Sequence, residues 1–342
     1  MNSNIESDYL GSGNKMKNGK LTENIWKRSV LKQIKTKRKE VITGAGIGAD
    51  CAVFSLEGSG LSAVSVQPVV WKGENAAKHA VYGAANAAAA SGAEPVAVMF
   101  SALLPVSTEE ADIRAMTEQI EEVCGQLNLQ AAGDGIRVTD AVNRPVLTMT
   151  GIGRLTGDAA SVKKIRPGQD IVASKWIGLE GTAILAHERE EELLTKYPFR
   201  FIEAAKEFDR FLSIVPEAAT AVKSGVCAMH GVTEGGIFGA LWELAEGAGV
   251  GLEIDLKRIP VKQETIEICE FFEINPYEFL SGGCLLMAAD NGYDLVRALA
   301  GTEIAAAVIG KTTQSNDRVV INEDERRFLE LPKPDEIYRV LG

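Results

Sequence analysis

The sequence predicts a protein of two domains that mix helices and strands, with an α+β or α/β order in each half. The chain has 342 residues, of which 46% are hydrophobic, and this is enough to bury two cores. Runs of β-branched residues alternate with amphipathic helical segments in both halves, as in folds that layer helices on a sheet. The turn-forming Arg166-Pro167-Gly168 separates the two halves.

The amino-terminal half is expected to follow a polar extension. Residues 1–20 are dominated by Asn, Ser, Gly and Lys and show no apolar period, so we expect a disordered or loosely held segment there. A domain is then expected over residues 21–155, beginning with a short helix at Leu21–Ile34. The next helix, Glu74–Ser91, is unusually rich in alanine, which would let another element approach it closely.

A long amphipathic helix is predicted further along this half. Ser107 and Glu110 have the spacing of a capping box, and the apolar period behind them continues to about Asn128. The strands expected here are Cys51–Leu56, Leu61–Val66, Val96–Leu104, Leu129–Ala132 and Val146–Leu155. The longest apolar stretches, such as Val96–Pro105, are too short to cross a bilayer and are typical of strands.

The carboxy-terminal half, residues 156–342, shows the same mixture with different spacing and no short-period repeat. The strands expected are Asp170–Ser174, Val226–Met229, Gly251–Asp255, Cys284–Ala289 and Ala305–Ile309. The helices expected are Gly181–Lys196, Phe201–Leu212, Glu217–Lys223, Glu234–Gly247, Gln263–Phe272 and Tyr293–Leu299.

Charge and cysteine content limit the classes of function. Residues 1–40 carry ten Lys and Arg against four Asp and Glu, whereas the rest of the chain carries 26 against 43. The basic segment is either a phosphate-contacting arm or the solvated face of a terminal helix. The acidic body argues against binding to nucleic acid. The sequence has five cysteines but no Cys-x-x-Cys pair, and it shows no leader and no membrane span, which together favour a cytoplasmic protein. Its three dispersed histidines argue against a zinc site.

The glycine-rich Gly44–Gly48 does not indicate a dinucleotide-binding loop. Such a loop opens a helix whose dipole meets the pyrophosphate, but here the strand-like Cys51–Leu56 follows directly. A Walker loop is also absent from the sequence. A nucleotide would therefore need a different architecture.

Four segments in order suggest that architecture. They are Gly48-Ala49-Asp50-Cys51-Ala52-Val53, Val64-Ser65-Val66-Gln67-Pro68-Val69, the helix end Asn86–Pro95, and the loop Met229–Gly236. They resemble, in turn, the Gly-x-Asp-x-Ala-Val strand, the Ser-x-Asp-Pro-Val strand, the Asn-Asp-x-x-x-x-Gly-Ala-Glu-Pro helix end and the Asp-x-Thr-x-Gly-Gly loop of the aminoimidazole ribonucleotide synthase (PurM-like) superfamily. The resemblance extends from about Leu21 to Val340 and is nearest to the HypE-like branch.

The resemblance implies two PurM-like domains, with the amino-terminal domains of a homodimer pairing into a β-barrel beside a cleft for magnesium and ATP. Family aspartates converge on the triphosphate because magnesium prefers hard oxygen ligands. Asp50 keeps one of them, but Gln67, Ala87 and Gly231 stand at three other positions. Because a lost ligand commonly lowers metal affinity by roughly tenfold or more, the resemblance implies weakened binding of magnesium and ATP.

Asp134 is the second metal ligand that the resemblance offers. The family segment Gly-Gly-Asp-Thr matches Ala132–Gly135 and keeps Asp134, whereas an alignment from Val138 places Gly135 there and turns Asp134 to the other face of the strand. The implied cofactor-binding residues are Asp50, Gln67, Asn86, Asp134, Lys175, Thr233, Glu234, Gly235 and Gly236. The last four open a helix whose amides either bind phosphate or serve only as an N-cap with packing glycines.

Three functions are compatible with this pattern. The leading hypothesis is a HypE-related protein with weakened or lost ATP turnover, a pseudoenzyme that acts as a dimeric binding or regulatory scaffold. The rival is an active ATP-dependent enzyme that phosphorylates an amide or carbamoyl oxygen, using Asp50 and Asp134. The third is a cleft adapted to a less charged small molecule. No cysteine follows Cys284, so the cysteine-tail chemistry of HypE is not expected, and no catalytic residue is assigned.

Overall fold

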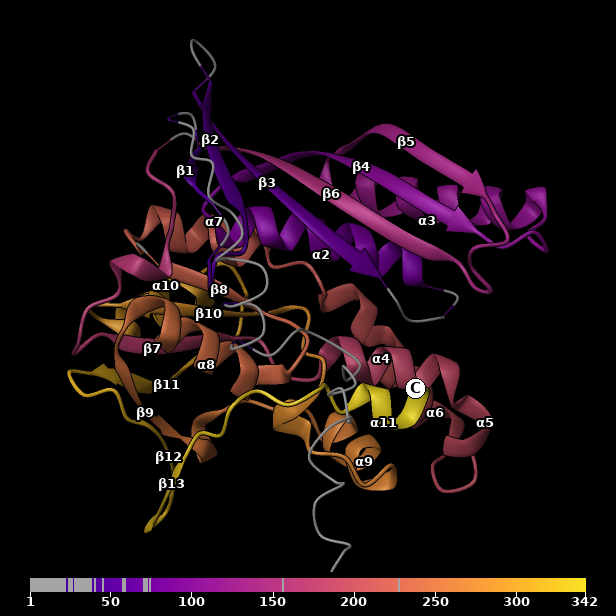
Figure 1. Cartoon of the computed structure of the whole chain (residues 1–342). Helices are drawn as coiled ribbons and strands as arrows, with labels where there is room; N and C mark the ends of the chain where they lie inside the picture. The colour runs from indigo at the N-terminus through magenta and orange to yellow at the C-terminus, as the bar shows by residue number, and fades with distance from the viewer. Residues whose placement is uncertain are drawn as a thin grey trace, which may run out of the picture.

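Figure 1 shows the chain as a computed structural model, which describes residues 23, 27, 39, 41–44, 46–56, 60–69, 73, 75–155, 157–226 and 228–342. The extension expected at residues 1–20 lies outside them. Of the helix expected at Leu21–Ile34, only Glu23 and Lys27 are described, and both are helical.

These two residues contact helix α8 (Gly236–Ala248) of the carboxy-terminal half. The Trp242 indole N–H donates to Glu23 Oε2 at 3.0 Å, and Lys27 Nζ donates to Glu246 Oε1 at 2.6 Å. Lys27 of the basic segment is therefore engaged by a carboxylate of the acidic body.

The first half forms a six-stranded sheet in the order β1-β2-β3-β6-β4-β5. Its strands are β1 Val41–Thr43, β2 Ala52–Leu56, β3 Gly60–Val69, β4 Glu94–Leu104, β5 Gln130–Val138 and β6 Val146–Leu155. Only β4 and β5 run parallel, and the other pairs are antiparallel. Among the described residues this sheet is open, with β1 and β5 at its edges, so one chain does not close the barrel that the resemblance implies.

Helices α2 (Ala76–Ala90) and α3 (Glu110–Leu127) cover one face of this sheet (Figure 1). Alternate residues of the strands point toward them, which places Val98, Phe100 and Met149 in a core with Ile120 of α3. The capping box expected at Ser107 and Glu110 was wrong by two residues. Glu109 is the N-cap of α3, and its N–H donates to Asp112 Oδ2 at 2.9 Å.

The close approach expected of the alanine-rich helix is confirmed. A Cβ added at Gly151 of β6 would lie 2.4 Å from the Ala84 carbonyl oxygen of α2, and one added at Gly153 would lie 3.1 Å from Ala88 Cβ. Glycines on the strand and alanines on the helix therefore let α2 lie directly on β6.

The second half forms a seven-stranded sheet in the order β13-β12-β9-β11-β7-β10-β8. Its strands are β7 Asp170–Ser174, β8 Ala228–Val232, β9 Gly251–Asp255, β10 Cys284–Ala289, β11 Ala306–Thr313, β12 Arg318–Asn322 and β13 Glu325–Phe328. Its helices, besides α8, are α4 Leu179–Glu188, α5 Glu190–Leu193, α6 Phe199–Lys206, α7 Val215–Lys223, α9 Gln263–Phe271, α10 Gly292–Ala300 and α11 Ile337–Leu341.

Three features of this half differ from the sequence-based expectation. The helix expected at Gly181–Lys196 breaks at Arg189 into α4 and α5. The hairpin of β12 and β13 was not expected, because its second strand is charged and fully exposed and carries no apolar alternation. The short α11 near the chain end was not expected either.

Within the described part of the chain, no helix combines the length and the apolar composition that crossing a membrane requires.

Helix α2 also forms the contact between the two halves. Ala89 and Ala90 at its carboxy-terminal end pack into a core with Ile214, Ala218 and Met229 of the second half. One face of α2 thus meets its own sheet and another meets the other domain, which is why small side chains occur all round it. We call the contact between the two domains the seam.

The contact between β6 and α2 predicts the effect of adding a single methyl group. Gly151→Ala should lower stability by about 1 to 3 kcal/mol, because the new Cβ meets a backbone oxygen that cannot move freely. Thermal unfolding measures this. The matched control is Gly83→Ala in α2, where a Cβ meets nothing within 4 Å, and it should be neutral or stabilising. Equal melting temperatures for the two variants would contradict the packing described.

Candidate functional site at the seam

Asp50 lies at the seam, just before β2. The turn ahead of it lies against α8, because Gly48 has φ +68° and a Cβ there would be 2.9 Å from the Glu243 carbonyl oxygen. Asp50 Oδ2 is 2.9 Å from His230 Nδ1, and Oδ1 accepts from the Gly231 N–H at 3.4 Å. The retained family aspartate is therefore held by β8 of the second domain.

His230 bridges two carboxylates. Its Nε2 is 3.0 Å from Glu243 Oε2 of α8, on the opposite side of the ring from Asp50. Burial alone would lower the pKa of His230, but the charges and hydrogen bonds of Asp50 and Glu243 outweigh it and raise the pKa to about 10. The His230 side chain is 6% exposed, so the positive charge that the two carboxylates favour on the imidazole is buried.

This bridge does not have the geometry of a metal site. The two carboxylates bind opposite ring nitrogens and share no common point, and among the described residues no group of three or more His, Cys, Asp and Glu side chains could hold a metal ion. A Cβ at Gly231 would lie 3.6 Å from Asp50 Oδ1, so an aspartate there would place its carboxylate beside that of Asp50. In this chain the imidazolium is the cation that neutralises Asp50.

The loop Thr233–Gly236 opens α8, and its N-cap is Gly235 at φ 88° rather than Thr233. The Gly235 N–H donates to Asp335 Oδ2 at 2.6 Å, and the N–H groups of Leu280 and Ile337 donate to Asp335 Oδ1. Asp335 is 1% exposed. Burial and, to a lesser degree, the neighbouring Glu234 raise its pKa to about 7, against the opposing backbone hydrogen bonds.

Asp335 therefore supplies from within the chain a carboxyl group that accepts from the amides at the start of α8, where a helix N-terminus would otherwise attract an anion. Sequence reasoning missed it, because Asp335 lies 100 residues from Gly235 in the sequence and no local pattern joins them.

Asn86 and Lys175 are both committed to the segment before α7. The Asn86 amide donates to the Leu212 carbonyl oxygen at 2.7 Å and accepts from the Ile214 N–H at 2.9 Å. Lys175 is buried, with φ 49°, and its Nζ donates to the Ser213 carbonyl oxygen at 2.5 Å. The same ammonium forms an ion pair with Glu217 Oε1, a buried oxygen that accepts no hydrogen bond of good geometry. Burial raises the pKa of Glu217.

The other predicted positions lie elsewhere. Gln67 is half-buried on β3 in register with Met149, and Asp134 is exposed on the edge strand β5 in register with Phe100. Four strand spacings separate β2 from β5, roughly 19 Å, so one chain does not bring Asp50 and Asp134 to one metal ion. Ala87 is 6% exposed in an apolar cluster with Cys51, Val53 and Leu155.

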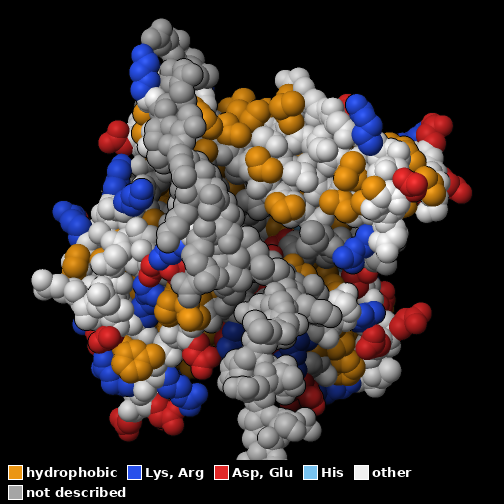
Figure 2. Space-filling model, in the orientation of Figure 1, with side chains coloured by type: hydrophobic (Ala, Val, Ile, Leu, Met, Phe, Trp, Pro, Cys, Tyr) orange, Lys and Arg blue, Asp and Glu red, His pale blue; other side chains and the backbone are white. Residues whose placement is uncertain are grey.

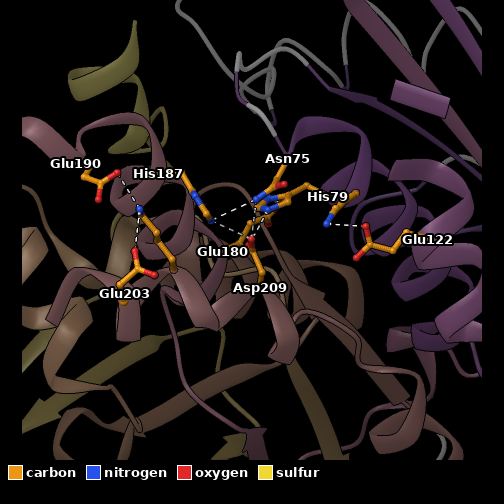
Figure 3. Close-up of polar contacts among 10 residues, drawn as sticks. Asn75, His79, Glu122, Glu180, His187, Glu190, Glu203 and Asp209 are labelled. Atoms are coloured by element: carbon orange, nitrogen blue, oxygen red, sulfur yellow. Dashed lines mark hydrogen bonds and ion pairs between the residues drawn. The ribbon is translucent and has the colours of Figure 1, made fainter. Parts of the chain in front are cut away.

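A second histidine bridge crosses the seam at the other end of α2 (Figure 3). His79 Nδ1 is 3.2 Å from Glu180 Oε1 of α4, and His79 Nε2 is 2.9 Å from Asp209 Oδ1 in the 3-10 turn Glu207–Phe211. Burial opposes the charged form, but the two carboxylates raise the pKa of His79 to about 9. Asp209 also contacts His187 Nε2 at 3.2 Å and accepts from Asn75 at 2.9 Å.

These contacts hold the pKa of Asp209 well below its usual range although burial opposes this. Sequence reasoning took the three histidines as dispersed, and in sequence they are. Folding brings His79 and His187 to one carboxylate and gives His230 two more, across separations of 13 to 180 residues for which no spacing rule exists.

Comparisons with known proteins agree with this fold. Residues 48–155 match the model of the N-terminal domain of AIR synthase related proteins, and residues 166–322 match that of their C-terminal domain. The fold is that of a two-domain AIR synthase-related protein. The chain belongs to this PurM-like family.

The relatives that it resembles include hydrogenase-maturation proteins. A putative hydrogenase expression/formation protein of Methanocaldococcus jannaschii is 27% identical over 304 residues, covering 86% of each chain. The carbamoyl dehydratase HypE of Rhodobacter capsulatus is 27% identical over 233 residues, covering 65% of this chain and 64% of the relative. A crystal structure of HypE in complex with ATP superposes with a TM-score of 0.70 at 18% identity, covering 94% of this chain and 97% of that one.

The two bridges predict a loss of stability in alkaline solution. Both histidines have folded pKa values above the ordinary 6.5, so the stabilisation is complete below pH 6.5 and is lost as the pH rises through about 9 and about 10. The loss should be on the order of 3 kcal/mol per histidine. Urea unfolding at pH 6.5 and pH 10 measures it.

The control is the double variant His79→Gln/His230→Gln, whose urea midpoint should change much less over the same range. A wild-type protein that is equally stable at both pH values would show that these imidazoles do not carry buried protons.

Proposed function

We propose that this chain is a HypE-like member of the AIR synthase-related family that has weakened or lost ATP turnover and binds magnesium and ATP only weakly. It would act in the cytoplasm as a homodimeric binding or regulatory protein. The observation that carries the proposal is the pairing of Asp50 with the His230 imidazolium, because the retained family carboxylate already has its counter-charge.

Three further features support it. The amides at the start of α8 already hold the Asp335 carboxylate, so a phosphate would have to displace it. Ala87 lies among apolar side chains, where a carboxylate would be costly. Lys175 is committed to Glu217 and Ser213 and does not offer a free cation to a phosphate.

A specific observation favours the rival, an active ATP-dependent enzyme. Relatives that the chain matches are named carbamoyl dehydratase, and HypE with the same fold binds ATP in its crystal structure. Activation of a carbamoyl or amide oxygen by phosphorylation would then use Asp50, with Asp134 reaching the cleft only from a second chain. A cleft adapted to a less charged small molecule is the remaining alternative.

Homodimerisation is the second part of the proposal, and the outer face of the first sheet supports it. Val66 of β3 and Val96, Met99 and Leu103 of β4 are exposed on strands that bury other residues in the core, and Val66 is 64% exposed. Figure 2 shows hydrophobic side chains gathered over this sheet. A second copy of the chain would cover them and could complete the family barrel.

Nucleotide binding tests the first part. Calorimetric titration of the wild-type protein with ATP should show no gain in affinity when magnesium is added, because Asp50 is neutralised and other ligands are missing. The triple variant Gln67→Asp/His230→Gln/Gly231→Asp should gain about tenfold or more with magnesium, since it frees Asp50 and adds two carboxylates. Ala87→Asp is left out because it would bury a charge.

The matched control carries Gly231→Asn in place of Gly231→Asp, with the same size and no charge, and should show a smaller gain. Tight magnesium-dependent ATP binding or steady hydrolysis by the wild-type protein would overturn the proposal in favour of the enzyme. Asp50→Asn would then show whether this carboxylate carries the metal.

Light scattering tests the second part. The wild-type protein should have twice the 36.6 kDa chain mass. Val66→Lys/Met99→Lys should give a folded monomer, because it places two charges on the proposed interface. Phe199→Lys on α6, a residue 58% exposed on the other domain, is the control and should leave the dimer intact. A wild-type monomer at every concentration would rule the dimer out.

A further inference from the structure

The two ends of α2 are attached to the second domain in different ways. At the carboxy-terminal end, Ala89 and Ala90 pack in a shared apolar core, and Asn86 makes two hydrogen bonds to the segment Leu212–Ile214. At the other end the attachment is mainly polar. His79 and Asn75 contact carboxylates of the second domain there, and Tyr82 packs against its apolar residues. Ten residues separate His79 from Ala89, so the two attachments lie about 15 Å apart along the helix.

The polar end is also less completely packed. A small pocket opens there between Gly73, Asn75, Ala76 and His79 of the first domain and Ile184, His187 and Glu188 of α4. A Cβ at Gly73 would lie 3.0 Å from Glu188 Oε1, so Gly73 lies close to α4. Tyr82 supplies an apolar contact across this end of the seam, and the start of α2 ahead of it contacts the second domain through the polar side chains of Asn75 and His79.

The His79 bridge is held by charge and by two hydrogen bonds against several opposing effects. The side chain is 2% exposed and lies in the first turn of α2, where the helix dipole disfavours a cation. Glu180, His187 and Glu188 face this region from α4, and Asp209 faces it from the 3-10 turn. Tyr82 and Asn75 border it from the side of α2. Without the imidazolium, the carboxylates of the second domain would face one another with no cation from the first.

We propose that the His79 bridge is a latch between the domains, whose release lets the amino-terminal end of α2 part from α4 while the carboxy-terminal end stays attached as a hinge. Opening would widen the pocket lined by Asn75, His187 and Glu188 and expose it to solvent. Loss of the proton from His79 or replacement of its side chain releases the latch. The latch does not depend on whether the chain binds a nucleotide.

Hydrogen exchange of the full chain, followed by mass spectrometry, tests this. In His79→Gln, peptides covering residues 75–82 and 184–188 should exchange about tenfold faster or more, whereas residues 86–90 should keep their protection. The control is Lys78→Gln, one position away on α2, because Lys78 pairs with Glu122 of α3 within the first domain and does not cross the seam. It should leave both peptides unchanged.

Two results would overturn the latch. One is unchanged exchange at residues 75–82 in His79→Gln. The other is equal acceleration over both domains, which would indicate a general loss of stability. If His79→Gln does not fold, Glu180→Gln decides, because it keeps the shape of the bridge and removes one of its two negative charges. Its exchange should rise at residues 75–82 alone, and no local rise there would overturn the proposal.

Discussion

Two pairs of partly buried carboxylates lie at the seam, and a cation between the members of each pair keeps them together, which shapes how the two halves of the chain meet. At each bridge an imidazolium supplies the cation: His230 between Asp50 and Glu243, and His79 between Glu180 and Asp209. In a medium less polarisable than water the attraction is strong, and so is the penalty for removing either partner. The domains are therefore joined by proton-dependent contacts as well as by apolar packing.

The same requirement connects the seam to the missing metal ligands. A cluster of aspartates needs a divalent ion to offset its charge, and that ion can leave with the nucleotide. Here Gln67, Ala87 and Gly231 carry no charge, and a covalently attached imidazole neutralises the aspartate that remains. In the same way, the Asp335 carboxyl group accepts from the amide at the start of α8, where a phosphate would otherwise bind. In the function proposed above, side chains of the chain itself take the places of both exchangeable partners, the metal cation and the phosphate anion.

Much of the architecture was predictable because it depends on local patterns. The alternation of β4 and the alanine content of α2 identified both elements, and four short motifs in order identified the family. The charged β13 and the break at Arg189 were not predictable, because they carry no apolar period and depend on tertiary contacts. The partners of Asp50 could not be predicted from the sequence either, because its hydrogen bond to His230 joins residues that lie 180 positions apart.

Helix α2 has a consequence for how this sequence can vary. Eleven of its fifteen residues are buried, because its own sheet and the neighbouring domain enclose it from two sides. A random library at Ala84, Ala85 and Ala87–Ala90 should therefore return folded members almost exclusively with Ala, Gly, Ser or Cys at those positions. A directed-evolution route that needs Asp at position 87 would first have to enlarge the surroundings formed by Cys51, Val53 and Leu155. The order in which substitutions are introduced would then decide whether a charged site can be rebuilt on this scaffold.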